Sequence, residues 1–239
     1  MCTVSYVPLA AGGFILSSNR DERMSRSNTL LPEAYPAGDD RHFFPRDEES
    51  SGTWIACSAS GRTYCLLNGA FENHISSPPY RKSRGLVLLE LLSAPRAEVY
   101  LLKEPLEGIE PFTLIMVSEK KEEPRLRELR WDGKRPFMKD LDSAAAHIWS
   151  SATLYDVQTR ADREHWFQQW LLENPEPGQE EILLFHRFGG HGDGENDLVM
   201  QRRNDRQTIS ITSVLSDGVR KEMCYEDLIQ GKKHRIEVR

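Results

Sequence analysis

The sequence predicts an α+β protein in which two antiparallel sheets lie between two layers of helices, an αββα sandwich. Three observations favour this fold class. Short apolar and β-branched runs come in pairs separated by turn residues, which indicates hairpins. Two longer stretches have helical periodicity. The elements follow the order strands, helices, strands, helices, strands, without the strand–helix alternation of a parallel sheet.

The first third of the chain predicts two hairpins. Residues 2–8 form one strand, Ala11-Gly12-Gly13 is a turn, and a return strand begins at Phe14 and ends near Asp21. Residues 24–51 are polar and contain three prolines, so we expect a long irregular loop there. Beyond it, a second hairpin is expected to pair residues 52–58 with 63–68.

The rest of the chain alternates between helical and extended segments. Leucines at helical spacing predict two helices within 82–103, divided by Pro95. The remaining expected elements are strands at 112–118, 125–131 and 148–151, helices at 157–172 and 179–188, and a last hairpin of 207–215 and 220–225. The residues at 189–197 read as a Gly-rich acidic loop, a flexible surface loop or flap rather than a metal site. Arg160, Arg163 and Arg81–Arg84 are expected on solvated faces.

Composition narrows the class of protein. The chain has 239 residues, 38% hydrophobic and 28% charged, which is typical of a globular protein. Nothing marks a domain boundary, so residues 1–239 are expected to form one domain. A net charge of −6 argues against a nucleic-acid partner, and the short basic run at 232–235 is interpreted as solvated charge. No stretch reaches the length of a membrane span, and we expect a cytoplasmic protein.

Cys2 and Asp21 are expected to lie close together, because they are at the free ends of two antiparallel strands. Removal of Met1 would leave Cys2 with both a thiol and a free α-amine. Such an amine can serve as the general base for the thiol, and Asp21 is the candidate that orients it. Arg20 is a candidate to lower the pKa of the thiol or to bind a substrate carboxylate. A purely structural interpretation, with Cys2 as a small strand residue, remains open.

Three segments carry a family resemblance: the opening Met-Cys-Thr, Ser-Asn-Arg-Asp-Glu at 18–22 and Gly-Thr-Trp at 52–54. With them the chain resembles the NRDE family, also called the transport and Golgi organisation family. It is similar, more distantly, to the choloylglycine and penicillin V acylases among the N-terminal-nucleophile hydrolases. That resemblance implies an αββα sandwich, a catalytic cysteine exposed by methionine removal, and hydrolysis of an amide bond.

The resemblance also implies roles for particular residues. Cys2 corresponds to the nucleophile and Asp21 to the aspartate that holds the α-amine. Asn68 corresponds to an oxyanion-hole asparagine, and a donor of this kind is worth roughly 3 to 4 kcal/mol in the transition state. Ser151 stands where the acylases have a second asparagine, and Arg206 resembles their late active-site arginine.

The leading hypothesis is a cysteine N-terminal-nucleophile hydrolase that cleaves a linear amide or related acyl bond and requires no metal or organic cofactor. The second hypothesis is a non-catalytic carrier of a small hydrophobic, anionic or haem-like ligand, which suits the haem handling and Golgi organisation associated with NRDE relatives. A redox sensor based on Cys2 ranks third, because no other cysteine is placed to resolve a sulfenate. In each case the partner is a small molecule, and the oligomeric state is open.

Overall fold

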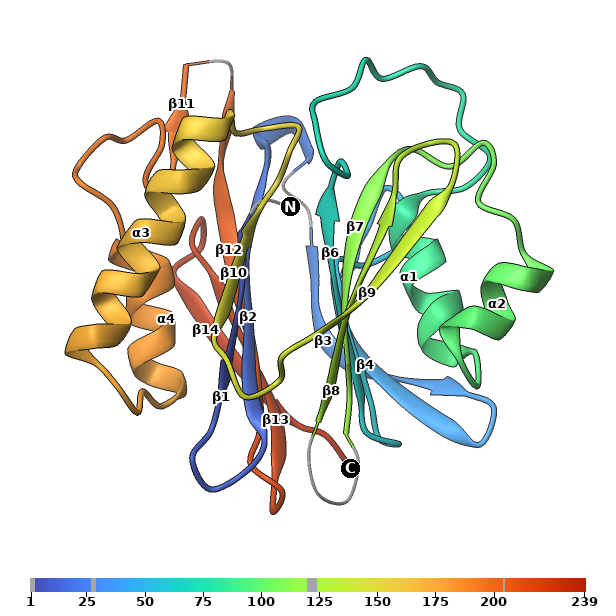
Figure 1. The fold of residues 1–239 in the computed structure, drawn as a ribbon, viewed down its shortest axis with the longest axis horizontal. Coiled ribbons are helices and arrows are strands. Elements are labelled where there is room, and N and C mark those ends of the chain that lie inside the picture. Colours follow the sequence, from blue (N-terminus) through green and yellow to red (C-terminus); the bar gives the residue numbers. More distant parts are fainter. Residues whose placement is uncertain (1–2, 27–28, 120–123, 204) are drawn as a thin grey trace.

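The chain folds into two antiparallel sheets that face each other between two helical layers (Figure 1). The computed structural model describes residues 3–26, 29–119, 124–203 and 205–239. One outer layer contains α3 (Val157–Glu173) and α4 (Gln179–Phe188), and the other contains α1 (Arg84–Ser93) and α2 (Ala97–Lys103). This arrangement confirms the α+β class and the αββα layering that the sequence predicts.

The first sheet joins strands from the beginning and the end of the chain. In spatial order it contains β10 (His147–Ser150), β1 (Thr3–Pro8), β2 (Phe14–Arg23), β12 (Arg206–Ser216), β13 (Lys221–Asp227) and β14 (Lys232–Glu237), and β11 (Gln201–Arg202) pairs with β12. The β1–β2 hairpin turns at Gly12 and Gly13, whose φ angles of 92° and 93° favour glycine. A Cβ atom on Gly13 would also lie 2.1 Å from the carbonyl oxygen of Ser216.

The second sheet is a meander in which each strand pairs with the next. It contains β3 (Thr29–Ala37), β4 (Asp40–Asp47), β5 (Ile55–Ser58), β6 (Arg62–Asn68), β7 (Phe112–Ser118), β8 (Arg125–Trp131) and β9 (Pro136–Leu141). The prediction of an irregular loop over 24–51 is therefore wrong, because most of that segment forms the β3–β4 hairpin. Its prolines are tolerated since β3 is an edge strand and Pro45 lies beyond the residues that pair with β5.

The helices form close to where periodicity predicts them, and side chains cap two of them. Ser83 accepts a hydrogen bond from the backbone N–H of Leu86 at the start of α1, and Asp156 accepts one from Thr159 at the start of α3. Among the described residues, no helix has the length and hydropathy that a membrane span requires.

Strands β1 and β2 of the first sheet are buried on both faces along most of their length. Tyr6 and Leu16 pack between the two sheets, whereas Val7 and Ile15 pack under α3 and α4 with Phe167 and other apolar side chains. Each such buried side chain contributes about 1.5 to 3 kcal/mol. The first hairpin is thus fixed from both sides, which holds the start of β1 and the end of β2 in place.

The basic run at 232–235 lies in β14, at the edge of the first sheet. Lys233 and Arg235 pair with Glu180 of α4 and remain partly exposed. Charged side chains of this kind protect an edge strand against pairing with another chain.

Candidate active site

The ends of four strands meet at one end of the sandwich, the upper end in Figure 1. Thr3, the first residue of β1, lies in register with Asn19 of β2 and Ser150 of β10. The next residue, Ser151, donates a hydrogen bond of 2.9 Å from its hydroxyl to the carbonyl oxygen of Asn68, the last residue of β6. The segment after β10 therefore connects the two sheets beside the start of β1.

Cys2, the predicted nucleophile, lies outside the described residues. Its covalent neighbour Thr3 is fully buried, and consecutive Cα atoms are about 3.8 Å apart. The groups around Thr3 therefore make up the surroundings in which a nucleophile at position 2 would act.

The Asn-Arg-Asp-Glu motif at the end of β2 distributes its side chains to two sides of the sheet, as strand alternation requires. Asn19 donates to the carbonyl oxygens of His186 in α4 and of Leu198, at 3.0 and 2.9 Å. Arg20 reaches across to the second sheet, where it meets Asp47. Asp21 returns to the helical side. The side chain of Arg20 therefore contacts the second sheet, and that of Asp21 lies on the helical side of the first sheet.

Asp21 is buried and accepts hydrogen bonds from side chains of two distant segments. The hydroxyl of Tyr155 donates to its Oδ2 at 2.5 Å, and the hydroxyl of Thr208 donates to its Oδ1 at 2.6 Å. Tyr155 precedes α3 and Thr208 lies in β12. These contacts fix the orientation of the carboxylate at the end of β2, and the role of Asp21 towards the α-amine stays a prediction.

Arg163 of α3 is the largest departure from the sequence-based interpretation. It was expected on a solvated face but is 0% exposed. Its Nη1 donates to the Thr3 hydroxyl at 2.5 Å, and its guanidinium carbon lies 3.6 Å from the centroid of the Tyr155 ring. It also donates to the carbonyl oxygens of Asn196 and Asp197. Arg163 thus connects α3, the start of β1 and the loop that follows α4.

Arg20 forms a buried ion pair with Asp47. Its Nη2 lies 2.5 Å from Asp47 Oδ2, its Nη1 donates to the Thr29 hydroxyl at 2.6 Å, and its guanidinium stacks 4.5 Å from the Trp54 ring centroid. Burial lowers the pKa of Arg20, and the charge of Asp47 opposes that shift. The role of Arg20 in binding a substrate carboxylate stays a prediction, and any such anion would share the guanidinium with Asp47.

Asp47 itself is kept ionised by its surroundings. Burial raises the pKa of this carboxyl group, but the N–H of Ser50 and the guanidinium groups of Arg26 and Arg20 outweigh burial and hold the pKa below its ordinary value. The carboxylate is therefore a permanent negative charge beside the site at neutral pH.

A polar cavity of about 330 Å³ opens between the second sheet and the start of α1. Arg20, Trp54 and Asn68 line one part of it, and Lys82 and Arg84 line another. Within the described part of the chain, the side-chain amide of Asn68 has no hydrogen-bond partner, so it is available to a ligand. Ser151, by contrast, uses its hydroxyl on the Asn68 backbone.

Arg206, the first residue of β12, lies outside this group. It is in register with Arg23, the last residue of β2, and it does not line the cavity. Ser151 and Asn68 therefore contact each other beside the start of β1, whereas Asp21 lies on the helical side with Tyr155 and Thr208. Arg20 lies on the inner face, and Arg206 lies further along the sheet.

His186 forms a buried cluster next to the site. Its Nε2 lies 2.6 Å from the Ser5 hydroxyl and its Nδ1 contacts Asn19 Oδ1. Burial and the nearby charge of Arg163 lower the pKa of His186 to about 3, so the imidazole is neutral. Because Asn19 Oδ1 can only accept, Nδ1 carries the proton and Nε2 accepts from Ser5.

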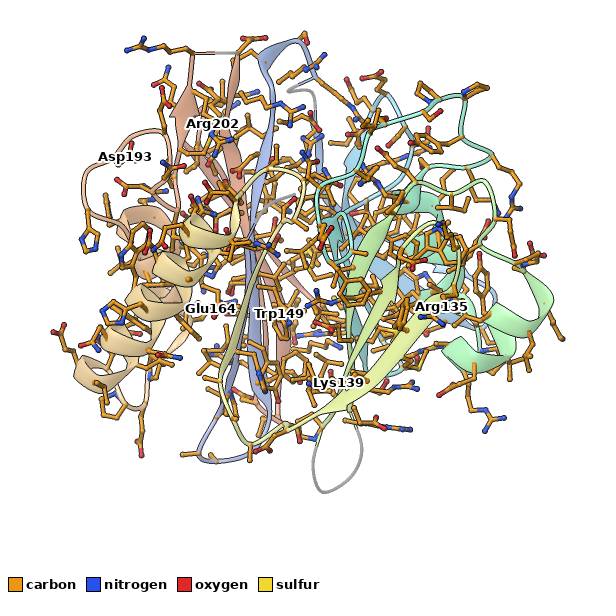
Figure 2. All side chains as sticks on the ribbon, turned by 45° about the horizontal axis from the view of Figure 1, so that its top comes forward. Arg135, Lys139, Trp149, Glu164, Asp193 and Arg202 are labelled. Atoms are coloured by element: carbon orange, nitrogen blue, oxygen red, sulfur yellow. The ribbon has the colours of Figure 1, made fainter. Side chains whose placement is uncertain are left out.

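The loop after α4 is held by hydrogen bonds from its own backbone. Asp197 accepts hydrogen bonds from the backbone N–H groups of His191 and Gly192. Figure 2 shows Asp193 on this loop and Arg202 on β11, and Arg202 donates to the carbonyl oxygen of Glu195. No cluster of three or more metal-binding side chains occurs in the described ranges.

Sequence reasoning missed four residues that hold this site: Asp47, Tyr155, Arg163 and Thr208. One signal was present for Arg163. Thr159, Arg163 and Phe167 are spaced four apart and form one buried face of α3. An arginine between two buried positions of a helix indicates a buried partner.

Comparison with known proteins identifies the family of this chain. Residues 1–208 match the family described as Transport and Golgi organisation 2, or TANGO2. The chain belongs to the TANGO2 family. This confirms the family resemblance that the sequence motifs indicate. A search of curated protein sequences found no match to this TANGO2 chain.

Solved structures of hydrolases share the fold of the TANGO2 chain. The Caenorhabditis elegans N-acylethanolamine-hydrolyzing acid amidase ortholog superposes with a TM-score of 0.60 at 12% identity, over 91% of this chain and 94% of its own. An arginine-to-leucine variant of the conjugated bile acid hydrolase from Clostridium perfringens gives 0.60 at 11%, over 99% and 92%. A cysteine-to-alanine mutant of that hydrolase gives 0.58 at 11%, with the same coverage. At such low identity the likeness shows the fold alone, that of the N-terminal-nucleophile hydrolases.

Proposed function

We propose that this chain is a cysteine N-terminal-nucleophile hydrolase that cleaves a linear amide or related acyl bond after removal of Met1. The observation that carries the proposal is the free side-chain amide of Asn68, which borders the polar cavity where β6 ends, next to the start of β1. A donor that no group in the described ranges uses, beside the first described strand, is suited to bind an oxyanion.

The reaction uses two steps with balanced proton transfers. The Cys2 thiol passes its proton to the α-amine, and Sγ bonds to the substrate carbonyl carbon, whose oxygen becomes an oxyanion bound by Asn68 and backbone N–H groups. The tetrahedral intermediate collapses, the C–N bond breaks, and the leaving amine takes the proton from the α-ammonium. Water, deprotonated by the same amine, then attacks the thioester carbonyl carbon. The C–S bond breaks, the acid product leaves, and the proton on the α-ammonium returns to the Cys2 sulfur. Asp21, held by Tyr155 and Thr208, orients the amine.

The cavity favours a polar or charged part in the substrate. Its lining includes Arg20, Lys82 and Arg84 as cations and Glu22 and Glu110 among its anions. An extended apolar group would leave these charges desolvated, which is costly. We therefore expect an amide whose acyl or amine part has a charged or strongly polar group.

A non-catalytic carrier is the second candidate, because two predicted site residues are already occupied by protein groups. Arg20 pairs with Asp47, and Ser151 donates to the Asn68 carbonyl oxygen. The lining of the cavity contains both cations and anions, which favours a polar ligand over a hydrophobic or haem-like one. A carrier would bind such a ligand stably and release it unchanged.

Hydrolysis of a panel of N-acyl amino acids and simple amides, followed by mass spectrometry, tests the proposal. We expect turnover by the native protein, loss of roughly 1,000-fold or more in Cys2→Ala, and retained turnover in Cys224→Ala, since Cys224 is buried in another part of the first sheet. Equal turnover by the native protein and Cys2→Ala would exclude Cys2 as the nucleophile. Saturable binding with no product would favour the carrier.

A further inference from the structure

Arg163 is a buried cation whose hydrogen-bond partners among the described residues are neutral groups. It is 0% exposed, and its printed hydrogen bonds go to the Thr3 hydroxyl and to the carbonyl oxygens of Asn196 and Asp197. In the ranges that the structure describes, it forms no ion pair. Glu164, which follows it in α3 and is labelled in Figure 2, is exposed and lies on a different face of the helix.

Burying a charge without a counterion is unfavourable, and such residues concentrate at functional sites. A methionine or leucine would fill the same space under α3 without that cost. The position of Arg163 indicates what its charge acts on. It lies against Thr3, the covalent neighbour of Cys2, and against the ring of Tyr155, whose hydroxyl donates to Asp21.

We propose that Arg163 is a positioning residue for the N-terminal nucleophile: it fixes the start of β1 and the Tyr155–Asp21 pair as one unit, and its charge favours the thiolate and the neutral amine at Cys2. This inference rests on the proposed function. It assigns to α3 a part in the reaction that neither the motif at the end of β2 nor the cavity supplies.

The positioning effect on the start of β1 and the electrostatic effect on Cys2 have separate physical origins. The planar guanidinium holds several acceptors at fixed angles, whereas an ammonium is a point charge that cannot reproduce that fork. The positive charge acts at longer range, and it already disfavours a proton on His186. A lysine at position 163 would keep the charge and lose the fork, and a methionine would lose both.

Other charged and titratable groups also lie around Arg163 and the start of β1, and they contribute to the titration of the thiol and the amine. They are Asp21 of β2, Tyr155 before α3, His186 of α4, Arg202 of β11 over the Tyr155 ring and, on the inner face, Arg20. Asp197 meets Arg163 through its backbone carbonyl, and its carboxylate binds the N–H groups of His191 and Gly192. Asp21 opposes Arg163 by favouring the protonated amine. The neutral His186 adds no charge. Removing Arg163 therefore removes one of the cations that oppose Asp21.

The test is the rate of Cys2 alkylation by limiting iodoacetamide as a function of pH, with peptide mapping, alongside kcat for any substrate found. In Arg163→Met we expect the midpoint of the alkylation profile to rise by about one pH unit. In Arg163→Lys we expect an unchanged midpoint and a kcat reduced roughly tenfold, since alignment is lost. Arg160→Met, one turn earlier on α3, is the matched control and should change neither.

Circular dichroism and thermal unfolding show whether each variant is folded. If Arg163→Met does not fold, Arg163→Lys decides, because a raised midpoint in that charged variant would overturn the electrostatic role. Identical midpoints in native protein, Arg163→Met and Arg163→Lys would overturn the inference while leaving a reactive Cys2, and hence the proposed function, intact. An ordinary thiol midpoint in the native protein would overturn both.

Discussion

The hydroxyl of Tyr155 donates a hydrogen bond of 2.5 Å to the carboxylate of Asp21, across 134 positions of the sequence. This contact ties the segment between β10 and α3 to the end of β2. Because the ring of Tyr155 also lies against Arg163, one tyrosine connects the aspartate of the Asn-Arg-Asp-Glu motif to the buried cation of α3.

Tyr155→Phe removes the donor to Asp21 and keeps the ring. We expect a loss of about 1 to 3 kcal/mol in the free energy of unfolding, because a buried carboxylate loses a charge-assisted hydrogen bond. Urea unfolding measures this loss. Tyr100→Phe is the control, since Tyr100 donates to the partly exposed Glu90. A larger loss in the control than in Tyr155→Phe would contradict the importance of the Tyr155–Asp21 contact.

The Arg20–Asp47 pair is expected to depend on both partners. Asp47→Ala leaves the guanidinium of Arg20 buried without its carboxylate, which costs about 3 to 5 kcal/mol of stability. Replacing both residues, as Arg20→Met with Asp47→Leu, should recover a large part of that loss. Urea unfolding of the native protein, both single variants and the double variant measures the coupling. Additive losses would show that the pair is not coupled.

The lowered pKa of Asp47 has a defined sign in the pH dependence of stability. Its folded pKa is below the unfolded value of about 3.9, so its contribution is present above that value and is lost as pH falls through the folded pKa. At neutral pH the contribution is complete.

His186 predicts a pH dependence in a higher range. Its folded pKa is about 3, whereas an unfolded histidine has about 6.5, so the unfolded state takes up a proton first as pH falls. Stability should fall by about 1.4 kcal/mol for each pH unit below about 6.5 from this group. Urea unfolding between neutral pH and pH 5 measures the slope. His186→Gln should flatten it, and His165→Gln, at an exposed position, should not.

Asn68 and Ser151 are expected to separate activity from stability. Asn68→Ala removes an amide that no described residue binds, so stability should change by less than about 0.5 kcal/mol, while kcat should fall by roughly 100-fold or more. Ser151→Ala removes the hydrogen bond that joins the two sheets and should cost about 1 kcal/mol. Thermal unfolding and kcat for both variants test this. The reverse pattern would place the oxyanion donor at Ser151 instead.

Elements that carry a short-range sequence signal were predicted correctly. The turn glycines of the first hairpin and the leucine periodicity of α1 are short-range features, and the structure places both elements where these features indicate. The β3–β4 hairpin was missed because its prolines read as breaks, although β3 is an edge strand that tolerates them. β9 and β14 were missed because exposed edge strands lack an apolar alternation.

The candidate site was predictable only where neighbours in the chain define it. Strand alternation places the side chains of Arg20 and Asp21 on opposite faces, and it depends on adjacent residues alone. The partners Asp47, Tyr155 and Thr208 were not predictable, since they come from other strands and a loop that only the packing of layers brings close. Arg163 read as solvated because an arginine is rarely fully buried.

Selective alkylation tests the central claim most directly. Burial raises the pKa of Cys57 and Cys65 to about 12 and that of Cys224 to about 11, so these thiols should stay protonated and inaccessible. The measurement is intact mass followed by peptide mapping after brief treatment with limiting iodoacetamide from about pH 5 to 9, around the reference pKa of a free thiol. We expect Met1 to be absent and Cys2 alone to react quickly below pH 7. Retained Met1, or a Cys2 that reacts only as an ordinary thiol, would contradict it.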